Sequence, residues 1–506
     1  MPAYLWRRFE EVVQHEPDRP AILQGHQAVS FGRLHQSALE LAGELFARGL
    51  VPGARCLICA SNSHQMAAAI LAVWRLGAIV ALVSDEATPS HLAQAAQMCD
   101  PAVVIVDASN VEAASRALRA SILVLDEPCA MRDDLPPPPP ISFHEPASIL
   151  FTSGSTGPPK GVAQSAANLM GGAAMVGRHL GLARHDRILC PIPWSFDYGY
   201  GQLLSMALLG VPLVLPQGRD PFAICEAIER LRPTVFAGLP SVFGLLLRGV
   251  SPVRQTDLGS LRLVTNTGGA IAPAVFADVL KIFGHCDISL NYGLTETYRS
   301  AGLPVALAAE RPNSVGFAYP GVNLVVIRED GREAEPDEVG QIVHSGAGVF
   351  LGYWNAPDAT GSTRRPDPLW RWPGLPPPMA VFTGDLGLKD IDGFLYLKGR
   401  RDRLIKSMGV RVSPEEIEGL IRESGLVRDV AVVGVPNDLT GQMVVAVVTV
   451  PEGVPDPRPA IKAFARGAMS AYMLPREYKV LDELPLTPNG KTDYVRLNEM
   501  FAREPA

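Results

Sequence analysis

The chain has 506 residues, which is too long for one hydrophobic core, so two or more domains are expected. Its composition, 47% hydrophobic and 19% charged, excludes a disordered protein. A net charge of −7 argues against a nucleic-acid partner, whose phosphates require a basic surface.

The cysteines and the apolar runs indicate a cytoplasmic protein without disulfides. Seven cysteines are an odd number and are scattered along the chain. Cys56 and Cys59 have the spacing of a metal or redox pair, but they lie in an apolar run that predicts a buried strand with free thiols. The N-terminus carries early charges and no apolar core of a secretory signal. Arg75 and Gly77 interrupt the apolar run at 66–83, which predicts a core helix and strand rather than a membrane span.

Helical and strand patterns alternate along the first part of the chain. Helices are predicted at 31–48, 64–76 and 89–98, and strands at 55–60, 79–83, 102–106 and 122–125. Such alternation predicts α/β units with parallel sheets. The proline run 136–140 follows as a stiff linker, because successive prolines cannot form a helix or a central strand.

A loop rich in glycine and hydroxyl residues follows a strand-like run at 147–151 and precedes a helix-like run at 168–179. The loop contains Thr152, Ser153, Gly154, Ser155, Thr156, Gly157 and Lys160. Its backbone N–H groups, its hydroxyls and the mobile charge of Lys160 suit a polyphosphate. It is not a Walker A loop, because Pro159 precedes Lys160 and Gly161 follows it. A flexible Gly/Ser turn is the alternative interpretation.

The pattern changes after Arg400. A charged segment leads to Ser413, a predicted N-cap, with Pro414 at the first helical position and Glu416 placed to close a capping box. Strands are predicted at 430–435 and 444–450, and a helix at 458–469. We therefore expect an α/β protein in which residues 1–401 form a large domain of αβ-layered sheets. Residues 402–506 are expected to form a small α+β domain, with the boundary at Asp402.

The loop at 152–161 resembles the signature loop of the adenylate-forming superfamily of acyl-CoA synthetases, nonribosomal-peptide adenylation domains and luciferases. Further segments match this family in order: 267–270, 291–296, 340–343 with 352–355, 383–385, 399–414 and 486–491. The resemblance covers nearly the whole chain and is nearest to AMP-forming acyl-CoA ligases. It implies that the small domain is mobile.

The resemblance implies that the chain uses ATP and Mg²⁺ to convert a carboxylic acid to an acyl-adenylate, and then transfers the acyl group to CoA. The alternative is loading of an amino or aryl acid onto the phosphopantetheine of a carrier protein in trans. A luciferase-like oxygenase and a non-catalytic nucleotide-binding protein are further alternatives. The joint presence of Lys160, Glu296, Asp385 and Lys491 argues against the last, since binding alone does not need Lys491.

The resemblance also implies residue roles. Lys491 bridges the substrate carboxylate and the α-phosphate, Thr295 binds that phosphate, and Glu296 holds Mg²⁺. Asp385 and Arg400 bind the ribose or phosphate oxygens. The other expected nucleotide contacts, besides the loop, are Gly268, Gly269, Ala270, Asn291, Tyr292 and Gly293. The expected acyl pocket contains Phe196, Asp197, Gly238 and Thr267, and the expected hinge and thiol tunnel contain Asp402, Lys406 and Gly409.

The segment 194–198 departs from simple fatty-acid or acetate enzymes. Two interpretations of Asp197 stay open. In the first, its carboxylate is the N-cap of a helix beginning near Tyr198. In the second, it faces the acyl pocket and binds a substrate ammonium, as an aspartate does in adenylation domains.

Overall fold

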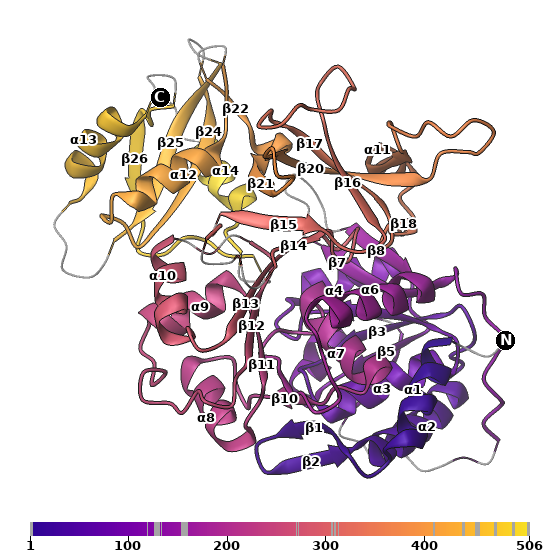
Figure 1. Cartoon of the computed structure of the whole chain (residues 1–506). Coiled ribbons are helices and arrows are strands. Elements are labelled where there is room, and N and C mark those ends of the chain that lie inside the picture. Colours follow the sequence, from indigo (N-terminus) through magenta and orange to yellow (C-terminus); the bar gives the residue numbers. More distant parts are fainter. Residues whose placement is uncertain are drawn as a thin grey trace.

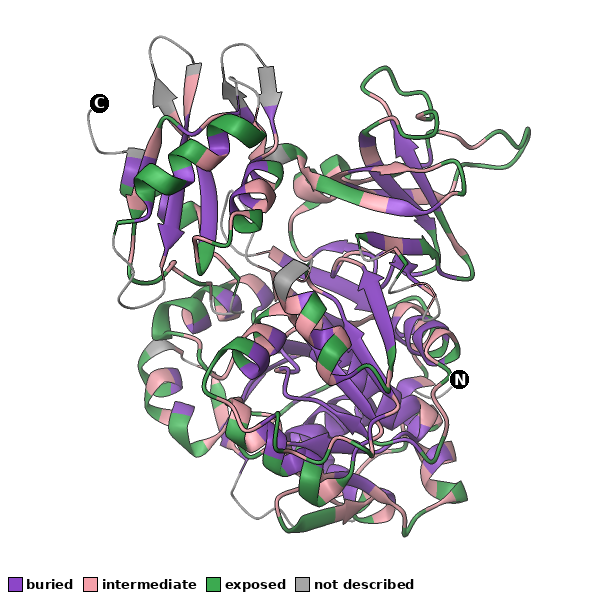
Figure 2. Ribbon diagram, turned by 60° about the vertical axis from the view of Figure 1, so that its left-hand side comes forward, coloured by how far each residue is buried: buried purple, intermediate pink, exposed green. Residues whose placement is uncertain are grey.

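The computed structural model describes residues 4–118, 120–125, 132, 134–152, 160–269, 271, 273–304, 307, 310–311, 313–407, 410–437, 441–450, 456–469, 473–487 and 491–502. These residues form three β-sheets with helices packed on them (Figure 1). The strands are largely buried, and the outward faces of the helices are exposed (Figure 2). Among the described helices, none is both long and apolar enough to cross a bilayer.

The first sheet has seven strands in the order β18-β8-β7-β4-β3-β5-β6. Their bounds are β3 (Arg55–Cys59), β4 (Ile79–Val83), β5 (Val103–Val106), β6 (Ser121–Val124), β7 (Pro146–Thr152), β8 (Lys160–Ser165) and β18 (Gly352–Tyr353). The strands from β7 to β6 are parallel, as the alternation of elements predicts. The sheet ends in the antiparallel pairs β7–β8 and β8–β18.

The second sheet has fourteen strands, in the order β16-β17-β20-β21-β15-β14-β13-β12-β11-β9-β10-β1-β2, with β19 paired to β20. Its bounds are β1 (Pro20–Gln24), β2 (Gln27–Ser30), β9 (Ile188–Leu189), β10 (Leu213–Leu215), β11 (Val235–Gly238), β12 (Leu263–Asn266), β13 (Asp287–Tyr292), β14 (Ala301–Gly302), β15 (Ser314–Ala318), β16 (Val322–Ile327), β17 (Gly340–Gly346), β19 (Arg364–Pro366), β20 (Met379–Lys389) and β21 (Leu395–Arg400). The run from β10 to β13 is parallel, and the pairs beyond β13 are antiparallel.

The helices of the first two sheets are α1 (Tyr4–His15), α2 (Phe31–Ala47), α3 (His64–Arg75), α4 (Pro89–Cys99), α5 (Val111–Ala117), α6 (Ala166–His179), α7 (Asp197–Leu209), α8 (Pro221–Leu231), α9 (Pro240–Arg248), α10 (Pro273–Ile282) and α11 (Pro357–Thr363), with a 3₁₀ turn at Ala108–Asn110. Helix α3 is buried from Met66 to Arg75, so the apolar run is a core helix followed by the core strand β4, as predicted. Cys56 and Cys59 are free and buried in β3, and burial raises the pKa of the Cys59 thiol to about 12.

The third sheet forms a separate lobe, coloured orange to yellow in Figure 1. Its strands are β22 (Ile405–Ser407), β23 (Val410–Val412), β24 (Asp429–Asn437), β25 (Gly441–Thr449) and β26 (Glu477–Val480), and its helices are α12 (Pro414–Glu423), α13 (Arg458–Ala468) and α14 (Tyr494–Ala502). The 3₁₀ turn Arg401–Arg403 joins β21 to this lobe. Ser413 caps α12 by accepting the Glu416 N–H at 3.4 Å, as predicted. The assignment of the domain boundary to Asp402 stays a prediction.

The helix predicted to follow the phosphate loop is α6, and a strand that was not predicted, β8, lies between the loop and this helix. The loop joins the antiparallel strands β7 and β8, in which Thr152 is paired with Lys160. Strand β8 begins at Lys160, the lysine of the loop, and ends at Ser165, immediately before α6. The N-terminus of α6 is instead closed by a reciprocal capping box between Ser165 and Asn168.

A buried charge cluster anchors the start of the small lobe. Arg403 forms ion pairs with Glu415 at 2.5 Å and with Glu418 at 2.9 Å, and its guanidinium lies 3.5 Å from the ring centroid of Tyr494. The Glu418 carboxylate also accepts the Val432 N–H at 2.8 Å and the Tyr494 hydroxyl at 3.0 Å. Arg403 is thereby held to α12 and α14, one residue after Asp402.

Replacing Glu418 with alanine should selectively destabilise the small lobe. The change leaves the buried Arg403, the Tyr494 hydroxyl and the Val432 N–H without their shared acceptor, at a cost of about 3–5 kcal/mol. Hydrogen exchange of peptides from β24 and β25, followed by mass spectrometry, should speed up about a hundredfold or more. Glu423→Ala on the exposed end of α12 is the control, and equal exchange in the two variants would contradict the assignment.

Candidate functional site

The predicted site residues gather at the carboxyl ends of neighbouring parallel strands, where open α/β sheets bind ligands. Gly238 ends β11, Thr267 follows β12, and Tyr292 ends β13. The three strands are adjacent and parallel in the second sheet. Their common direction is what brings the three segments to one edge.

Asp385 is held from two sides. Residues Asp385 and Arg400 are paired directly across β20 and β21, and Arg400 Nη1 lies 2.9 Å from Asp385 Oδ1. The Tyr292 hydroxyl donates to Asp385 Oδ2 at 2.6 Å. The Asp385 N–H donates to Thr383 Oγ1 at 3.1 Å. The carboxylate is thus oriented by a phenol on one oxygen and a guanidinium on the other.

A second group contains Glu296, Tyr353 and Lys160. The Tyr353 hydroxyl donates to Glu296 Oε1 at 2.7 Å, and Lys160 Nζ lies 4.9 Å from the centroid of the Tyr353 ring. Lys160 begins β8, and Tyr353 lies on β18, the strand paired with it. The antiparallel pair of β8 and β18 at the edge of the first sheet therefore places Lys160 and Tyr353 near Glu296.

The two tyrosines, Tyr292 and Tyr353, have similar electrostatic surroundings. Burial raises the pKa of both Tyr292 and Tyr353, and their carboxylate partners Asp385 and Glu296 raise it further. The charge of Arg400 acts in the opposite sense on both phenols. Both tyrosines therefore stay protonated and serve as donors to the carboxylates.

Lys491 reaches this region from the small lobe. Its Nζ lies 5.3 Å from the centroid of the Phe196 ring, immediately before α7. The Lys491 N–H donates to Thr487 Oγ1 at 3.2 Å, and the Thr487 N–H donates to the Lys491 carbonyl at 2.7 Å. These bonds close the turn from which the lysine side chain projects toward the large lobe.

Three of the site glycines are required by close packing. A Cβ on Gly293 would lie 2.9 Å from the Arg299 Cα, and a Cβ on Gly238 would lie 2.4 Å from the Phe243 ring. Gly268 has a φ of +81°, and its open side faces Leu239 and Phe196. The neighbouring Gly269 carbonyl accepts the Asn266 side-chain N–H at 3.0 Å.

The side chain of Asn291 is occupied by internal contacts, whereas Thr295 is held through its backbone carbonyl. The Asn291 amide donates to the Asn266 and Ser289 carbonyls at 3.2 Å each, and its oxygen accepts the Tyr319 hydroxyl at 2.6 Å. The Thr295 carbonyl accepts the Gln164 Nε2 at 2.5 Å. Asn291 therefore supports the segment through the protein, whereas the Thr295 hydroxyl accepts and donates no bond within the described residues.

Both interpretations of Asp197 need revision. The N-cap of α7 is Phe196, which makes no side-chain capping bond, so the capping interpretation is wrong. Asp197 is the first residue of the helix, and its Oδ2 lies 3.4 Å from Nη1 of the buried Arg299. A substrate ammonium would therefore meet a carboxylate that already has a cationic partner.

Some predicted positions remain without a structural account. Ser153, Gly154, Ser155, Thr156, Gly157, Ala270 and Gly409 lie outside the described residues. Asp402 lies in the 3₁₀ turn before β22, and Lys406 lies in β22. Their roles, like those of the other site residues, stay predictions.

The sequence reasoning missed Arg299 and Tyr353. Arg299 was detectable as a lone charge shortly after Glu296, before the apolar residues 301–303. Tyr353 lay within the recognised 352–355 segment, but only the pairing of β18 with β8 brings it to Glu296.

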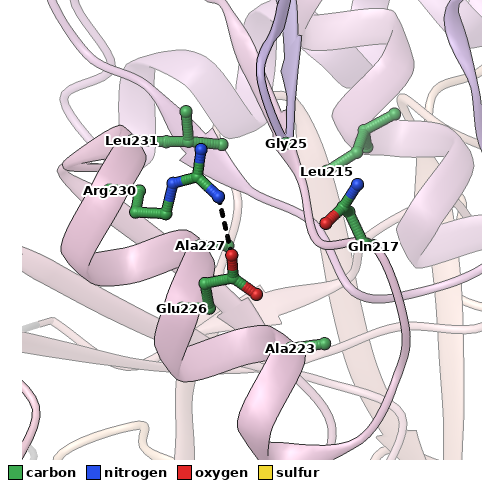
Figure 3. A pocket seen from close by; sticks show the side chains of 8 residues that line it. All are labelled: Gly25, Leu215, Gln217, Ala223, Glu226, Ala227, Arg230 and Leu231. Atoms are coloured by element: carbon green, nitrogen blue, oxygen red, sulfur yellow. Dashed lines mark hydrogen bonds and ion pairs between the residues drawn. The ribbon is translucent and has the colours of Figure 1, made fainter.

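A small pocket far from this constellation lies between the end of β10 and α8 (Figure 3). It holds about 10 Å³, which is room for a single water. The cation that borders it, Arg230, is already paired with Glu226 at 2.7 Å. This pocket is too small for an organic substrate.

Comparisons with known proteins agree with the geometry. The AMP-binding enzyme family matches residues 9–354, and the AMP-binding enzyme C-terminal domain matches residues 416–491. The 2-succinylbenzoate–CoA ligase of Geobacillus kaustophilus is 30% identical, and the alignment covers 93% of this chain and 92% of that one. The indoleacetate–CoA ligase of Aromatoleum aromaticum is also 30% identical, with 97% and 96% covered.

Solved structures extend the likeness to the whole fold. ATP-bound MatB from Rhodopseudomonas palustris is 26% identical and superposes with a TM-score of 0.88, covering 99% of each chain. The amide bond synthetase McbA from Marinactinospora thermotolerans is 27% identical, with a TM-score of 0.85 and 99% of each chain covered. The chain therefore belongs to the AMP-binding enzyme family and is a ligase of the acyl-CoA synthetase type.

Proposed function

We propose that the chain joins a carboxylic acid to AMP from ATP, releases pyrophosphate, and then transfers the acyl group to the thiol of CoA. The observation that carries this proposal is the position of Lys491 over the ring of Phe196, a residue of the predicted acyl pocket. A protein that only binds a nucleotide has no need of a lysine at that place. The names of the relatives include succinylbenzoate and indoleacetate ligases, so they support an acid substrate without selecting one.

The chemistry explains why charges of both signs are required. A carboxylate is a poor electrophile because its leaving group would be an oxide, and attachment to AMP supplies a good one. Attack at the α-phosphorus places negative charge on the acid, the phosphate and the departing pyrophosphate. In the proposed arrangement Lys491 stabilises the charge shared by acid and α-phosphate, and Lys160 stabilises the pyrophosphate side. Asp385 binds the ribose hydroxyls.

Glu296 has the chemistry to hold Mg²⁺ together with substrate oxygens. One of its oxygens accepts the Tyr353 hydroxyl, and Oε2 has no partner within the described residues. No cluster of three or more metal-ligating side chains occurs in the described part of the chain. A single carboxylate sharing the ion with a triphosphate is the usual arrangement for Mg²⁺. The ion supplies charge neutralisation on the phosphates.

In this proposal Lys491 withdraws from the site before the second half-reaction. The segment that joins the two lobes, residues 400–403, indicates where the chain turns. Arg403 is locked to the small lobe through Glu415 and Glu418, and Arg400 is paired with Asp385 on the large lobe. A rotation that keeps both anchors is confined to residues 401–402. This argument supports the proposed hinge at Asp402 and the proposed presentation of the segment around Lys406 and Gly409 to the thiol.

The test of the function separates its two steps. Exchange of labelled pyrophosphate into ATP, over a panel of fatty, aryl and amino acids, reports adenylate formation. Thioester formation with free CoA, compared with a phosphopantetheinylated carrier protein, reports the acceptor. We expect acid-dependent exchange and acyl-CoA formation. Absence of exchange with every acid would refute the activity, and transfer only to the carrier would favour the alternative acceptor.

Lys491→Ala should lower adenylate formation by about two to four powers of ten, the range for loss of one transition-state charge. Thioester formation from supplied acyl-adenylate should survive, because the lysine acts only before the turn. Pyrophosphate exchange and CoA acylation measure the two steps separately. Lys462→Ala, at an exposed position of α13, is the control. Equal losses in both steps would contradict the proposed role.

Tyr353→Phe should raise the KM for Mg·ATP about tenfold, because a bond to a charged group contributes ~1.5 kcal/mol. The phenol orients the Glu296 carboxylate, so excess Mg²⁺ should partly restore activity. Tyr396→Phe removes a similar bond, a 3.1 Å contact to Asp390 away from the site, and serves as the control. An unchanged dependence on Mg²⁺ would separate Tyr353 from the metal.

Asp402→Pro should block the second step while adenylate formation persists. Proline fixes φ at its own position and restricts Arg401, so the turn between the lobes is frozen. Because Lys491 lies against Phe196 in this structure, the state preserved is the adenylating one. Asp402→Ala removes the carboxylate without restricting the backbone and should retain both steps. Normal thioester formation by the proline variant would place the hinge elsewhere.

A further inference from the structure

Arg299 is a buried cation that is only partly satisfied. Its side chain is 4% exposed, and its carboxylate partner Asp197 lies at 3.4 Å, a long distance for a charged hydrogen bond. Arg299 Nη1 also donates to the Tyr298 carbonyl at 2.6 Å. The planar group lies 4.8 Å from the Tyr198 ring centroid and 5.6 Å from that of Tyr298.

The other donors of Arg299 are unused. A guanidinium carries five N–H groups, and both bonds to the protein involve Nη1. Nε and Nη2 donate to no acceptor within the described residues. Nη2 lies 4.0 Å from the place of a Cβ on Gly201, so the glycine leaves space beside it. Because the side chain as a whole is only 4% exposed, an acceptor on a bound ligand would satisfy these donors better than the little solvent that reaches them.

A second unsatisfied group directly follows strand β12 and precedes Gly268. Thr267 is 2% exposed, and its Oγ1 has no hydrogen-bond partner in the described part of the chain. Two residues earlier, Thr265 makes a hydrogen bond with the Tyr198 hydroxyl, and the Tyr198 ring faces Arg299. Thr267 follows the end of this strand and directly precedes Gly268, where an added Cβ would lie 3.5 Å from Phe196, the ring near Lys491.

We propose that Arg299 is a specificity-determining residue that binds an uncharged oxygen, a hydroxyl or a carbonyl, on the acyl chain of the substrate acid. Asp197 is a positioning residue that holds the guanidinium. The assignment rests on the proposed function, since it presumes that the acid's carboxylate lies at Lys491. Thr267 supplies a further hydrogen bond on this side of the pocket.

The balance of charge between Arg299 and Asp197 favours an acid with an uncharged oxygen on its acyl chain. Arg299 and Asp197 cancel each other, so a neutral oxygen leaves the buried group neutral and satisfies its spare donors. A substrate ammonium would be repelled by the guanidinium, and a second carboxylate would leave one uncompensated negative charge in the interior. An unsubstituted acyl chain would leave the donors without an acceptor.

The experiment compares acids that differ in one group. Pyrophosphate exchange is measured with hexanoate, 3-hydroxyhexanoate, 3-oxohexanoate, 6-hydroxyhexanoate, 6-aminohexanoate and adipate. An aryl set, 3-phenylpropanoate and its 4-hydroxy derivative, covers a ring. In the wild type, kcat/KM for the best oxygenated acid should exceed that of its parent by about a hundredfold or more, as for sites built to bind a hydroxyl.

Arg299→Met should reduce this ratio to about threefold or less while retaining activity on the parent acid, because only the binding of the oxygen is lost. Arg299→Lys should restore part of the ratio. Arg262→Met breaks a comparable pair with the buried Asp186 and should leave the ratio unchanged. Asp197→Asn leaves Arg299 unneutralised, so adipate should gain about tenfold relative to the hydroxy acids.

Three outcomes would overturn the assignment: equal use of oxygenated and parent acids by the wild type, a preference for the amino or dicarboxylic acid, or an unchanged ratio in Arg299→Met. A failure of the proposed function is distinct, because no acid would then support exchange. Exchange without discrimination would overturn this assignment alone.

Discussion

The pairing of β20 with β21 is the constraint on which the rest of the site depends. It sets Asp385 opposite Arg400, and the Tyr292 hydroxyl then completes the environment of the carboxylate. A register shift of one residue would turn both side chains to other faces of the sheet. Because the chain crosses to the small lobe immediately after Arg400, the same strand pair also fixes where the small lobe begins.

Every buried or half-buried carboxylate of the described site is oriented by a phenol, a guanidinium or both. Tyr353 serves Glu296, Tyr292 and Arg400 serve Asp385, and Arg299 serves Asp197. Such partners donate hydrogen bonds to the acids at low solvent exposure, where an unpaired charge would be costly. Phenols suit this role, because burial beside an acid raises their pKa and they remain donors.

The two lobes divide the chemistry in space. The large lobe carries the predicted nucleotide and acid contacts, and the small lobe brings one lysine to them. Arg403 fastens the junction to the small lobe through its ion pairs with Glu415 and Glu418. An anchor on each side of a short turn is what the proposed hinge needs if Lys491 is to act in one half-reaction and withdraw in the next.

The sequence by itself determined the fold class, the element order and the family, because hydrophobic periodicity and short backbone motifs are local properties of the chain. It predicted the bounds of β4, and those of α2, α3 and α13 to within one residue. It also named Lys491, Glu296 and Asp385. Only the tertiary structure decided the partners of those residues. Strand β8 separates the phosphate loop from α6, Tyr353 reaches Glu296 through the β18–β8 pair, and Arg299 meets Asp197 across about a hundred residues. Contacts of that kind arise from strand register and helix packing, which no local pattern encodes.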